Sequence, residues 1–290
     1  MTRRSPAKGD RLPVAARALN VLLLAVVVAS MGLPMLNVLA VSFSTRANSQ
    51  SPGLVLAPVP PSVEGYTFIW DFVDLWRPFF NTVLVAVAGT VLHVLLSSMC
   101  GYVLAQQGVP LRKVMTTFVL LTMVIPTELT LVAIYAVNRQ FHLVNSYVGL
   151  IVNGAVSGFS ALLMRGFFLS LPPSLGEAAV MDGCPQFRIF SRIYVPLSIP
   201  GVVTIGTLQL ISRWNNISMV VTLISDARKT TLPVVLRALV FDRSSISGTE
   251  FVFANATMAA VVITAVPLIV LYFSAQRFFV TGALVGATKE

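Results

Sequence analysis

Side chains able to do chemistry are few in this chain, and they are not grouped as a catalytic centre requires. The sequence holds two histidines, His93 and His142, and two cysteines, Cys100 and Cys184, and none of them has a neighbour at metal-ligand spacing. No HExxH, GxSxG or paired-aspartate pattern occurs, and there is no Gly-x-x-x-x-Gly-Lys-Ser/Thr phosphate loop. We therefore expect no metal, no cofactor and no catalytic residue in this chain, and we expect that it is not an enzyme.

Four residues stand out in otherwise apolar surroundings: Glu128, and the run Arg213, Trp214 and Asn215. Charged side chains within membrane spans usually face the bundle interior or a cavity, because exposure to lipid costs a few kcal/mol or more. One interpretation is that these residues line a path for a polar substrate. The other is structural: the two charges pair with each other or with a partner subunit, and Trp214 marks a membrane interface.

A further group of residues lies in the polar segment from Leu171 to Pro196. Ser174 and Glu177 have the spacing of a capping box, in which each side chain bonds the other's backbone N–H, so a short helix is predicted to begin at Ser174. Gly183 follows and offers a sharp backbone reversal. The segment is therefore predicted to fold as a short helix, a turn and a second short helix.

The two predicted short helices differ in the surface that they present. Ala178 and Ala179 give the first a small surface that permits close approach. Phe187, Phe190 and Ile193 recur at helical spacing in the second and are predicted to form an apolar anchor.

All of these residues lie within long apolar runs of the sequence or in the segments between them. Hydrophobic residues make up 56% of the 290 residues and charged residues only 11%, against about 25% in ordinary soluble domains. A helix needs roughly 20 apolar residues to cross about 30 Å of hydrocarbon. The sequence predicts an all-α integral membrane protein with six transmembrane helices, at Ala18–Phe43, Phe80–Leu104, Val114–Val137, Val148–Phe168, Leu197–Ile224 and Ala256–Val280.

Basic residues predict the orientation of these spans. Arg3, Arg4, Lys8, Arg11 and Arg17 precede the first span, and such residues collect on the cytoplasmic side of membranes. Both termini are therefore expected in the cytoplasm, and the net charge of +9 reflects topology rather than nucleic-acid binding. The predicted parts are a cytoplasmic tail at 1–17, a transmembrane domain at 18–290, an external loop at 44–79 that ends in a short helix, and a cytoplasmic loop at 169–196.

The first apolar run also has the features of a signal peptide, with a basic leader and the sequence Val38-Leu39-Ala40. It exceeds the roughly 7–15 apolar residues of such a peptide, so an uncleaved helix is favoured. Pro126 and Pro267 fall inside predicted spans, where neighbouring helices can satisfy the freed backbone groups.

The loop around Glu177 resembles the EAA loop of ABC importer permeases. The matching positions, at the family's spacing, are Glu177, Ala178, Ala179, Gly183, Ile193 and Pro196. Val195 is a mild departure, because the family prefers leucine before the final proline. In that family the loop forms a coupling helix that docks in a groove of a cytoplasmic ATPase subunit. The resemblance implies a type I ABC importer transmembrane domain in which ATPase coupling falls to Glu177, Ala178, Ala179, Asp182, Gly183, Phe187, Ile193 and Pro196.

Other segments are similar to carbohydrate importer permeases of the maltose-permease type. They are Pro126–Tyr135, Leu143–Tyr147, Phe167–Pro172 and Trp214-Asn215. The C-terminal segment Gln276–Lys289 is similar to a branch associated with complex oligosaccharides. The resemblance implies that the chain imports a sugar or oligosaccharide by alternating access.

The resemblance also implies partners in a bacterial inner membrane. They are a second, usually non-identical permease subunit, two cytoplasmic ATPase subunits and an extracytoplasmic substrate-binding protein. Because this chain has no phosphate loop, ATP and Mg²⁺ are expected on the ATPase. No nucleic-acid partner is expected.

Two other functions stay open. One is an amino-acid or peptide permease of the same importer superfamily, against which only the flanking similarities argue. The other is a secondary transporter driven by an ion gradient, which has no need of a coupling loop. An intramembrane enzyme is not supported, since no nucleophile–base pair or metal cluster falls within the spans.

Overall fold

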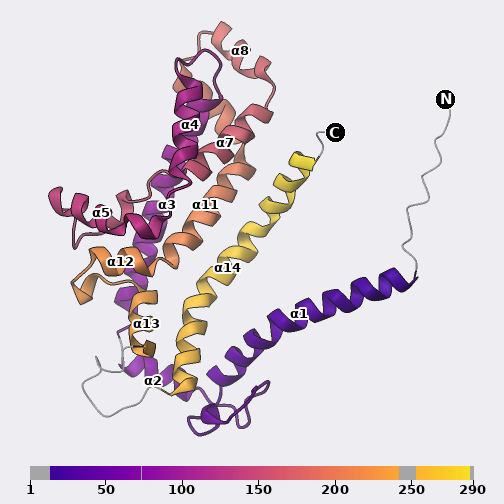
Figure 1. Ribbon diagram of the computed structural model, residues 1–290, viewed down its shortest axis with the longest axis vertical. Helices are drawn as coiled ribbons and strands as arrows, with labels where there is room; N and C mark the ends of the chain where they lie inside the picture. Colours follow the sequence, from indigo (N-terminus) through magenta and orange to yellow (C-terminus); the bar gives the residue numbers. More distant parts are fainter. Residues whose placement is uncertain (1–13, 73, 242–252, 288–290) are drawn as a thin grey trace. The chain divides into compact units, whose positions relative to one another are not determined.

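A computed structural model describes residues 14–72, 74–241 and 253–287 (Figure 1). The regular elements of the described residues are helical, apart from one isolated antiparallel bridge between Ser44 and Pro61. The chain divides into two compact units, and the described residues of the first are 14–72 and 253–262. The long helix α14 (Ala254–Ala287) contributes to both units.

The first unit contains α1 (Val14–Ser42) and α2 (Glu64–Phe72), joined by a loop that includes a short 3₁₀ helix, η1 (Asn48–Gln50). Within this loop the backbone N–H of Arg46 donates a 2.9 Å hydrogen bond to Oε2 of Glu64, which ties the start of the loop to α2. The short helix predicted near the end of the external loop is therefore present as α2.

The second unit is built around three helices, α3 (Trp76–Ala105), α7 (Gly158–Ser170) and α11 (Ile199–Trp214), which contact one another (Figure 1). Helices α3 and α7 approach closely, since a Cβ placed on Gly101 would lie 2.7 Å from the backbone oxygen of Ala161. The polar loops and turns described below connect to these three helices or pack against them.

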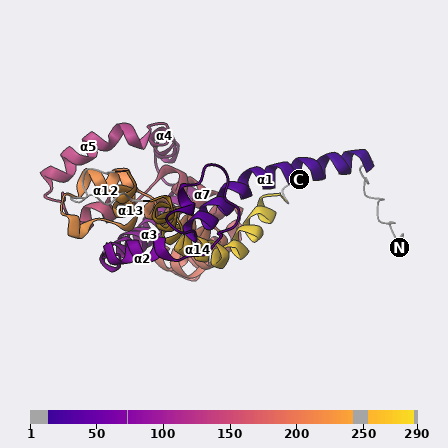
Figure 2. The ribbon, with the colours of Figure 1, turned by 90° about the horizontal axis from the view of Figure 1, so that it is seen from below.

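Shorter elements complete the second unit. They are α4 (Arg112–Thr122), α5 (Thr127–Gln140), α6 (Tyr147–Val152), α8 (Pro173–Met181), α9 (Gln186–Ile189), the π-helical turn η2 (Phe190–Tyr194), α10 (Val195–Leu197), α12 (Ile217–Leu223), the 3₁₀ helix η3 (Ala227–Lys229) and α13 (Leu232–Phe241). Figures 1 and 2 show α5, α12 and α13 gathered on one side of α3, and α12 contacts both α5 and α13.

Three described helices are long and apolar enough to cross a membrane: α1, α3 and the part of α14 from Ala254 to Ser274. Two bent pairs, α4 with α5 and α9–α10 with α11, raise this number to five if each pair is one span. The prediction of an all-α membrane protein is confirmed, with three to five candidate spans in the described residues.

The third predicted span, Val114–Val137, is not one continuous helix. Helix α4 ends at Thr122, α5 begins at Thr127, and the two helices meet at 101°. Pro126 accounts for the break, because proline has no backbone N–H and disfavours the helical conformation in the residue before it.

The fourth and fifth predicted spans are also interrupted. Val148–Phe168 is split into α6 and α7 by a turn in which Gly154 has a φ of +75°. Leu197–Ile224 is wrong at its end, because α11 stops at Trp214 and α12 is a separate helix. Pro267, in contrast, lies inside α14 without ending it.

Candidate functional site

The loop from Leu171 to Pro196 folds as a helix, a turn and a second helical segment, as predicted. Its first helix, α8, starts at a proline, and the preceding Pro172 is an N-cap that makes no side-chain bond. The predicted capping box is therefore wrong, and Ser174 lies within the first turn. The preset φ of a proline at the first helical position starts the helix instead, which leaves the carboxylate of Glu177 free for other contacts.

Two backbone hydrogen bonds end α8 in a Schellman turn. Gly183 N–H donates to Val180 O and Cys184 N–H donates to Ala179 O, each at 3.0 Å. Both bonds satisfy carbonyls that the helix end would otherwise leave unpaired. Gly183 has a φ of +71°, in the left-handed region that glycine adopts most easily. The reversal predicted at Gly183 is confirmed.

An aromatic cluster (Tyr102, Phe168, Phe190 and Tyr194) holds the second helical segment against α3 and α7. The ring of Tyr102 lies 5.3 Å from that of Phe190 and 5.1 Å from that of Tyr194, between centroids, and Phe168 packs edge-on against Tyr102 and Tyr194. Phe190 is 5% exposed and Tyr194 9%. Such aromatic pairs contribute about 0.5–1.5 kcal/mol each beyond area burial, so the loop is fixed to the helices that carry it.

The predicted apolar anchor is correct in part. Phe190 is buried and Ile193 is half-buried against the aromatic cluster. Phe187 is 66% exposed, so its prediction is wrong. A π-helical turn over Phe190–Tyr194 widens the helix there, and regular helical spacing does not continue through it. Tyr194 takes the buried place. It lies four residues after Phe190, a spacing that also places two side chains on one helix face, so the sequence pattern could have indicated it.

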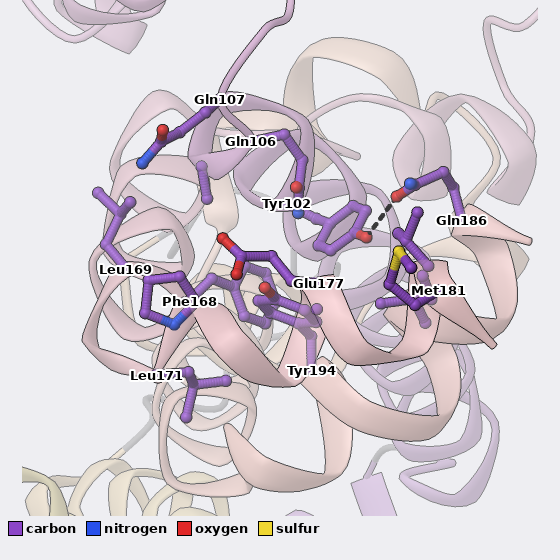
Figure 3. Close-up of a pocket in the computed structure, with 15 residues that line it drawn as sticks. Tyr102, Gln106, Gln107, Phe168, Leu169, Leu171, Glu177, Met181, Gln186 and Tyr194 are labelled. Atoms are coloured by element: carbon purple, nitrogen blue, oxygen red, sulfur yellow. Dashed lines mark hydrogen bonds between the residues drawn. The ribbon is translucent and has the colours of Figure 1, made fainter. Parts of the chain in front are cut away.

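A cavity of about 400 Å³ lies between α8 and the C-terminal ends of α3 and α7 (Figure 3). Tyr102 Oη donates a 2.8 Å hydrogen bond to Gln186 Oε1 at its wall. Glu177, Met181 and Gln106 also line it, so both apolar and polar groups face the cavity.

Five exposed side chains of the loop (Glu177, Val180, Met181, Asp182 and Phe187), called its outer face below, combine apolar and acidic groups, and three of them also line the open cavity just described. Met181 is 87% exposed, Phe187 66% and Val180 51%. No Lys, Arg or His of the described chain lies within 4.0 Å of either carboxylate. An exposed apolar patch with unpaired acids is typical of a protein-binding surface.

The remaining residues of the predicted coupling set divide between the two sides of the loop. Ala179 is buried against the aromatic cluster, whereas Ala178 is exposed beside Glu177. Pro196 lies within α10, directly after the π-helical turn, and is exposed.

Glu128 and Asn215, both predicted for a substrate path, share one hollow of about 450 Å³ between α5 and the α11–α12 junction. Glu128 lies in the first turn of α5. The other residues that line the hollow are Thr127, Leu131, Ser212, Asn216, Ile217, Ser218 and Met219. This hollow is called the α5–α12 hollow below. Its lining is largely hydroxyl and amide, which suits a ligand with many hydroxyl groups.

Arg213 and Trp214 do not line the α5–α12 hollow. Arg213 is 8% exposed, and its guanidinium donates to the carbonyl oxygens of Leu150, Ile151 and Asn153 at 2.9, 3.1 and 3.1 Å. It makes no ion pair with Glu128, so that alternative is wrong within this chain.

Trp214 is also buried, at 6% exposed, and its Nε1 donates to the carbonyl of Thr264 at 3.2 Å. Its ring packs edge-on against Phe79. The structure therefore gives both Arg213 and Trp214 structural contacts rather than surface positions.

His93 is fully buried on α3. Its ring nitrogens lie 2.8 Å from Gly154 O and 2.8 Å from Ser160 Oγ. His93 and Arg213 thus bond both sides of the elbow between α6 and α7 (residues 153–157). In the described residues, no group of His, Cys, Asp and Glu side chains could hold a metal ion.

A polar cluster fixes the opposite end of α3. Asn81 Nδ2 donates to the carbonyls of Arg228 and Thr230 at 3.0 and 2.9 Å, and Tyr147 Oη donates to Asn81 Oδ1 at 2.7 Å. This cluster, which sequence reasoning did not identify, holds the loop that contains η3.

Comparison with known proteins gives consistent matches. The model of the family described as "binding-protein-dependent transport system inner membrane component" matches residues 94–283. The polygalacturonan/rhamnogalacturonan transport system permease protein YtcP of Bacillus subtilis is 29% identical over 89% of this chain and 92% of its own. The arabinooligosaccharides transport system permease protein AraQ of Halalkalibacterium halodurans is 30% identical over 88% of this chain and 90% of its own.

Among solved structures, a bacterial ABC transporter involved in the import of the acidic polysaccharide alginate contains a chain with the same fold. The TM-score is 0.83 at 24% identity, and the match covers 92% of this chain and 99% of that one. The fold that carries both the loop and the α5–α12 hollow is therefore one already seen in an ABC transporter.

Proposed function

The chain belongs to the family of binding-protein-dependent transport system inner membrane components, and from this premise we propose that it carries a sugar or oligosaccharide across the membrane, with the loop Leu171–Pro196 as its coupling element. It is a multi-pass inner-membrane permease subunit of a bacterial ABC importer and is not the catalytic subunit. The curated relatives named above transport saccharides, according to their names, and this supports a saccharide rather than an amino acid or peptide.

Six spans with both termini in the cytoplasm remain part of the proposal. Two of the spans would be the bent pairs α4 with α5 and α9–α10 with α11, and α6 with α7 would make a third broken span. Breaks of this kind leave backbone groups unpaired within the membrane, where water cannot satisfy them. Arg213 and His93 bond such groups at the α6–α7 elbow, and this supports placing the elbow within the membrane.

The observation that carries the coupling proposal is the outer face of the loop. Its exposed apolar side chains surround two carboxylates, and no cation of the described residues lies within 4.0 Å of either. A partner protein with a groove that contains a basic side chain would bury the apolar side chains and pair with the carboxylates. The aromatic cluster, in turn, ties the loop to α3 and α7, so a movement of the bound partner is passed to the membrane helices.

Several partners follow from this proposal. The family implies an ATPase and a substrate-binding protein in general. We propose two ATPase subunits, which bind ATP and Mg²⁺, and a second permease subunit whose helices complete the pore. An 18-residue apolar stretch of α1 has no buried residue, which leaves it available to lipid or to such a subunit.

The substrate path proposed for this chain passes the α5–α12 hollow. Hydroxyl and amide groups line it, and Asn215 is exposed there with its side-chain oxygen unpaired in the described part of the chain. Alternating access would open this hollow to each side of the membrane in turn.

Charge reversal at Glu177 tests the coupling proposal. In the assembled transporter, Glu177→Arg should abolish sugar uptake and weaken retention of the ATPase during purification, because the reversed charge cannot pair with a basic groove. Lys113→Glu is the matched control: it reverses an exposed charge at the start of α4, on the same predicted side of the membrane. Normal uptake and normal ATPase retention in Glu177→Arg, at equal membrane insertion, would refute the coupling role.

A further inference from the structure

The α5–α12 hollow contains one charged side chain among the residues that line it, the carboxylate of Glu128. No cationic group of the described chain lies within 4.0 Å of this carboxylate. The remaining polar groups of the lining are neutral hydroxyls and amides, as at Ser212, Asn215 and Ser218. The local charge that a ligand meets on this wall is therefore negative.

Two nearby sources of positive charge do not reverse this sign. The N-terminus of α5 carries a partial positive charge of about half a unit from the helix dipole, and Glu128, in its first turn, outweighs it with a full negative charge. Arg213 lies close in sequence to Asn215, but its guanidinium is buried and donates to three backbone carbonyls of the α6 end and the elbow. It is therefore not offered to a ligand carboxylate.

Neutral and acidic sugars interact differently with a negatively charged wall. A neutral oligosaccharide presents hydroxyls that can donate to a carboxylate and exchange hydrogen bonds with amides and hydroxyls. A uronic-acid chain presents a carboxylate on each residue, which needs a cationic partner when it leaves water. At an effective dielectric constant of about 20, two like charges roughly 6–8 Å apart repel enough to shift an equilibrium by about tenfold or more.

We propose that Glu128 makes the α5–α12 hollow selective for uncharged oligosaccharides and against uronic-acid chains, so that the substrate of this permease is a neutral saccharide. This inference rests on the proposed sugar path through the hollow, and it names the chemical class of that sugar.

The experiment compares two probes in the complete transporter, reconstituted in proteoliposomes with its binding protein: a neutral arabinotriose and a trigalacturonate. Affinity of the binding protein for each probe is measured separately, and uptake is expressed per loaded binding protein, so that selectivity outside the membrane is removed. Glu128→Gln keeps the shape of the side chain and removes its charge, and Glu128→Lys reverses it. Asp71→Asn on α2 is the matched control for loss of one exposed charge elsewhere.

The measured quantity is the ratio of uptake rates, neutral probe over uronate. This ratio should be about ten or more in the wild-type transporter and in Asp71→Asn. It should fall about tenfold in Glu128→Gln and further in Glu128→Lys. An unchanged ratio in both Glu128 variants, or wild-type uptake of the uronate at the neutral rate, would overturn the charge selectivity.

Asn215→Ala separates this failure from failure of the path itself. If the hollow lies on the sugar path, Asn215→Ala should raise the KM for the neutral probe, whatever the Glu128 variants do. If neither Asn215→Ala nor the Glu128 variants alter uptake of either probe, the hollow is not on the path and both proposals fall.

Discussion

Arg213 of α11 caps the C-terminal end of α6, its Nη1 donating to the carbonyl oxygen of Leu150 at 2.9 Å while Nη2 reaches Ile151 and Asn153. The last carbonyls of a helix have no partner within the helix. Arg213 donates three hydrogen bonds to carbonyl oxygens that lie 60 to 63 positions earlier in the chain. Gly89 makes room for it, since a Cβ there would lie 2.4 Å from Nη1.

Replacing Arg213 by glutamine should destabilise the protein by about 2–4 kcal/mol. Glutamine reaches at most one of the three carbonyls, and each hydrogen bond lost within a membrane costs roughly 0.6–1.7 kcal/mol. Thermal unfolding of the purified transporter measures the effect as a lower transition temperature. Arg139→Gln is the control, because Arg139 is an exposed arginine at the end of α5 with no side-chain bond among those of the described residues. Equal transition temperatures for the two variants would contradict the capping role.

Gly101→Ala should also destabilise the protein, by about 1–3 kcal/mol. Its Cβ would lie 2.7 Å from Ala161 O and 2.9 Å from Arg165 N, so α3 and α7 would have to move apart at the backbone. Gly166→Ala on α7 is the matched control, since no atom lies within 4 Å of its Cβ. There alanine should be neutral or stabilise the helix by up to about 1 kcal/mol. A transition temperature that does not fall in Gly101→Ala would mean that these helices are not in close contact.

Tyr102 and Gln186 should be energetically coupled. The hydrogen bond from Tyr102 Oη to Gln186 Oε1, 2.8 Å long, joins α3 to the start of α9. Tyr102→Phe keeps the ring packing and removes the bond, and Gln186→Ala removes the acceptor. A double-mutant cycle on unfolding should give a coupling energy of about 0.5–1.5 kcal/mol. Additive effects would show that the bond does not contribute.

The features of the fold and the site that the sequence predicts are those set by residues close together in the chain. Apolar runs of membrane length predicted α1, α3 and α14, because each run is contained in one stretch of sequence. The turn at Gly183 was also predictable, since glycine adopts its φ most readily. The N-cap of α8 was misplaced by two residues because two rules competed, and Pro173 at the first helical position prevailed over the capping box of Ser174 and Glu177.

The contacts that complete the site could not be read from local patterns. Tyr102 lies 84 positions from Gln186, and the aromatic cluster joins residues from α3, α7 and η2. Arg213 was a candidate for the substrate path because the sequence shows that the side chain is charged but not which way it points. The structure turns it toward the end of α6 and leaves Asn215 at the α5–α12 hollow.

Gly183 offers a test of the turn that is separate from packing. A Cβ at this position would have no atom within 4 Å, so any effect of substitution comes from the backbone φ of +71°. Gly183→Asn should cost less than about 1 kcal/mol, because asparagine tolerates this region, whereas the β-branched side chain in Gly183→Val should cost more and misplace α9. Sugar uptake and ATPase retention should therefore fall in Gly183→Val and be largely kept in Gly183→Asn. Equal uptake by the two variants would show that the left-handed turn is not needed for coupling.

Asn81 should control the position of the loop that contains η3. Its amide nitrogen donates to the carbonyls of Arg228 and Thr230, and its oxygen accepts from Tyr147 Oη. Asn81→Asp keeps the shape but replaces the donor by a carboxylate oxygen, which faces two carbonyls with the wrong sign. Asn81→Asp should therefore release the loop, whereas Tyr147→Phe removes one bond and leaves both amide donations in place. Spin labels on Ala227 and Thr90 of α3 should give a broadened distance distribution in Asn81→Asp and a narrow one in Tyr147→Phe. A narrow distribution in both variants would mean that the backbone of the loop holds its position without Asn81.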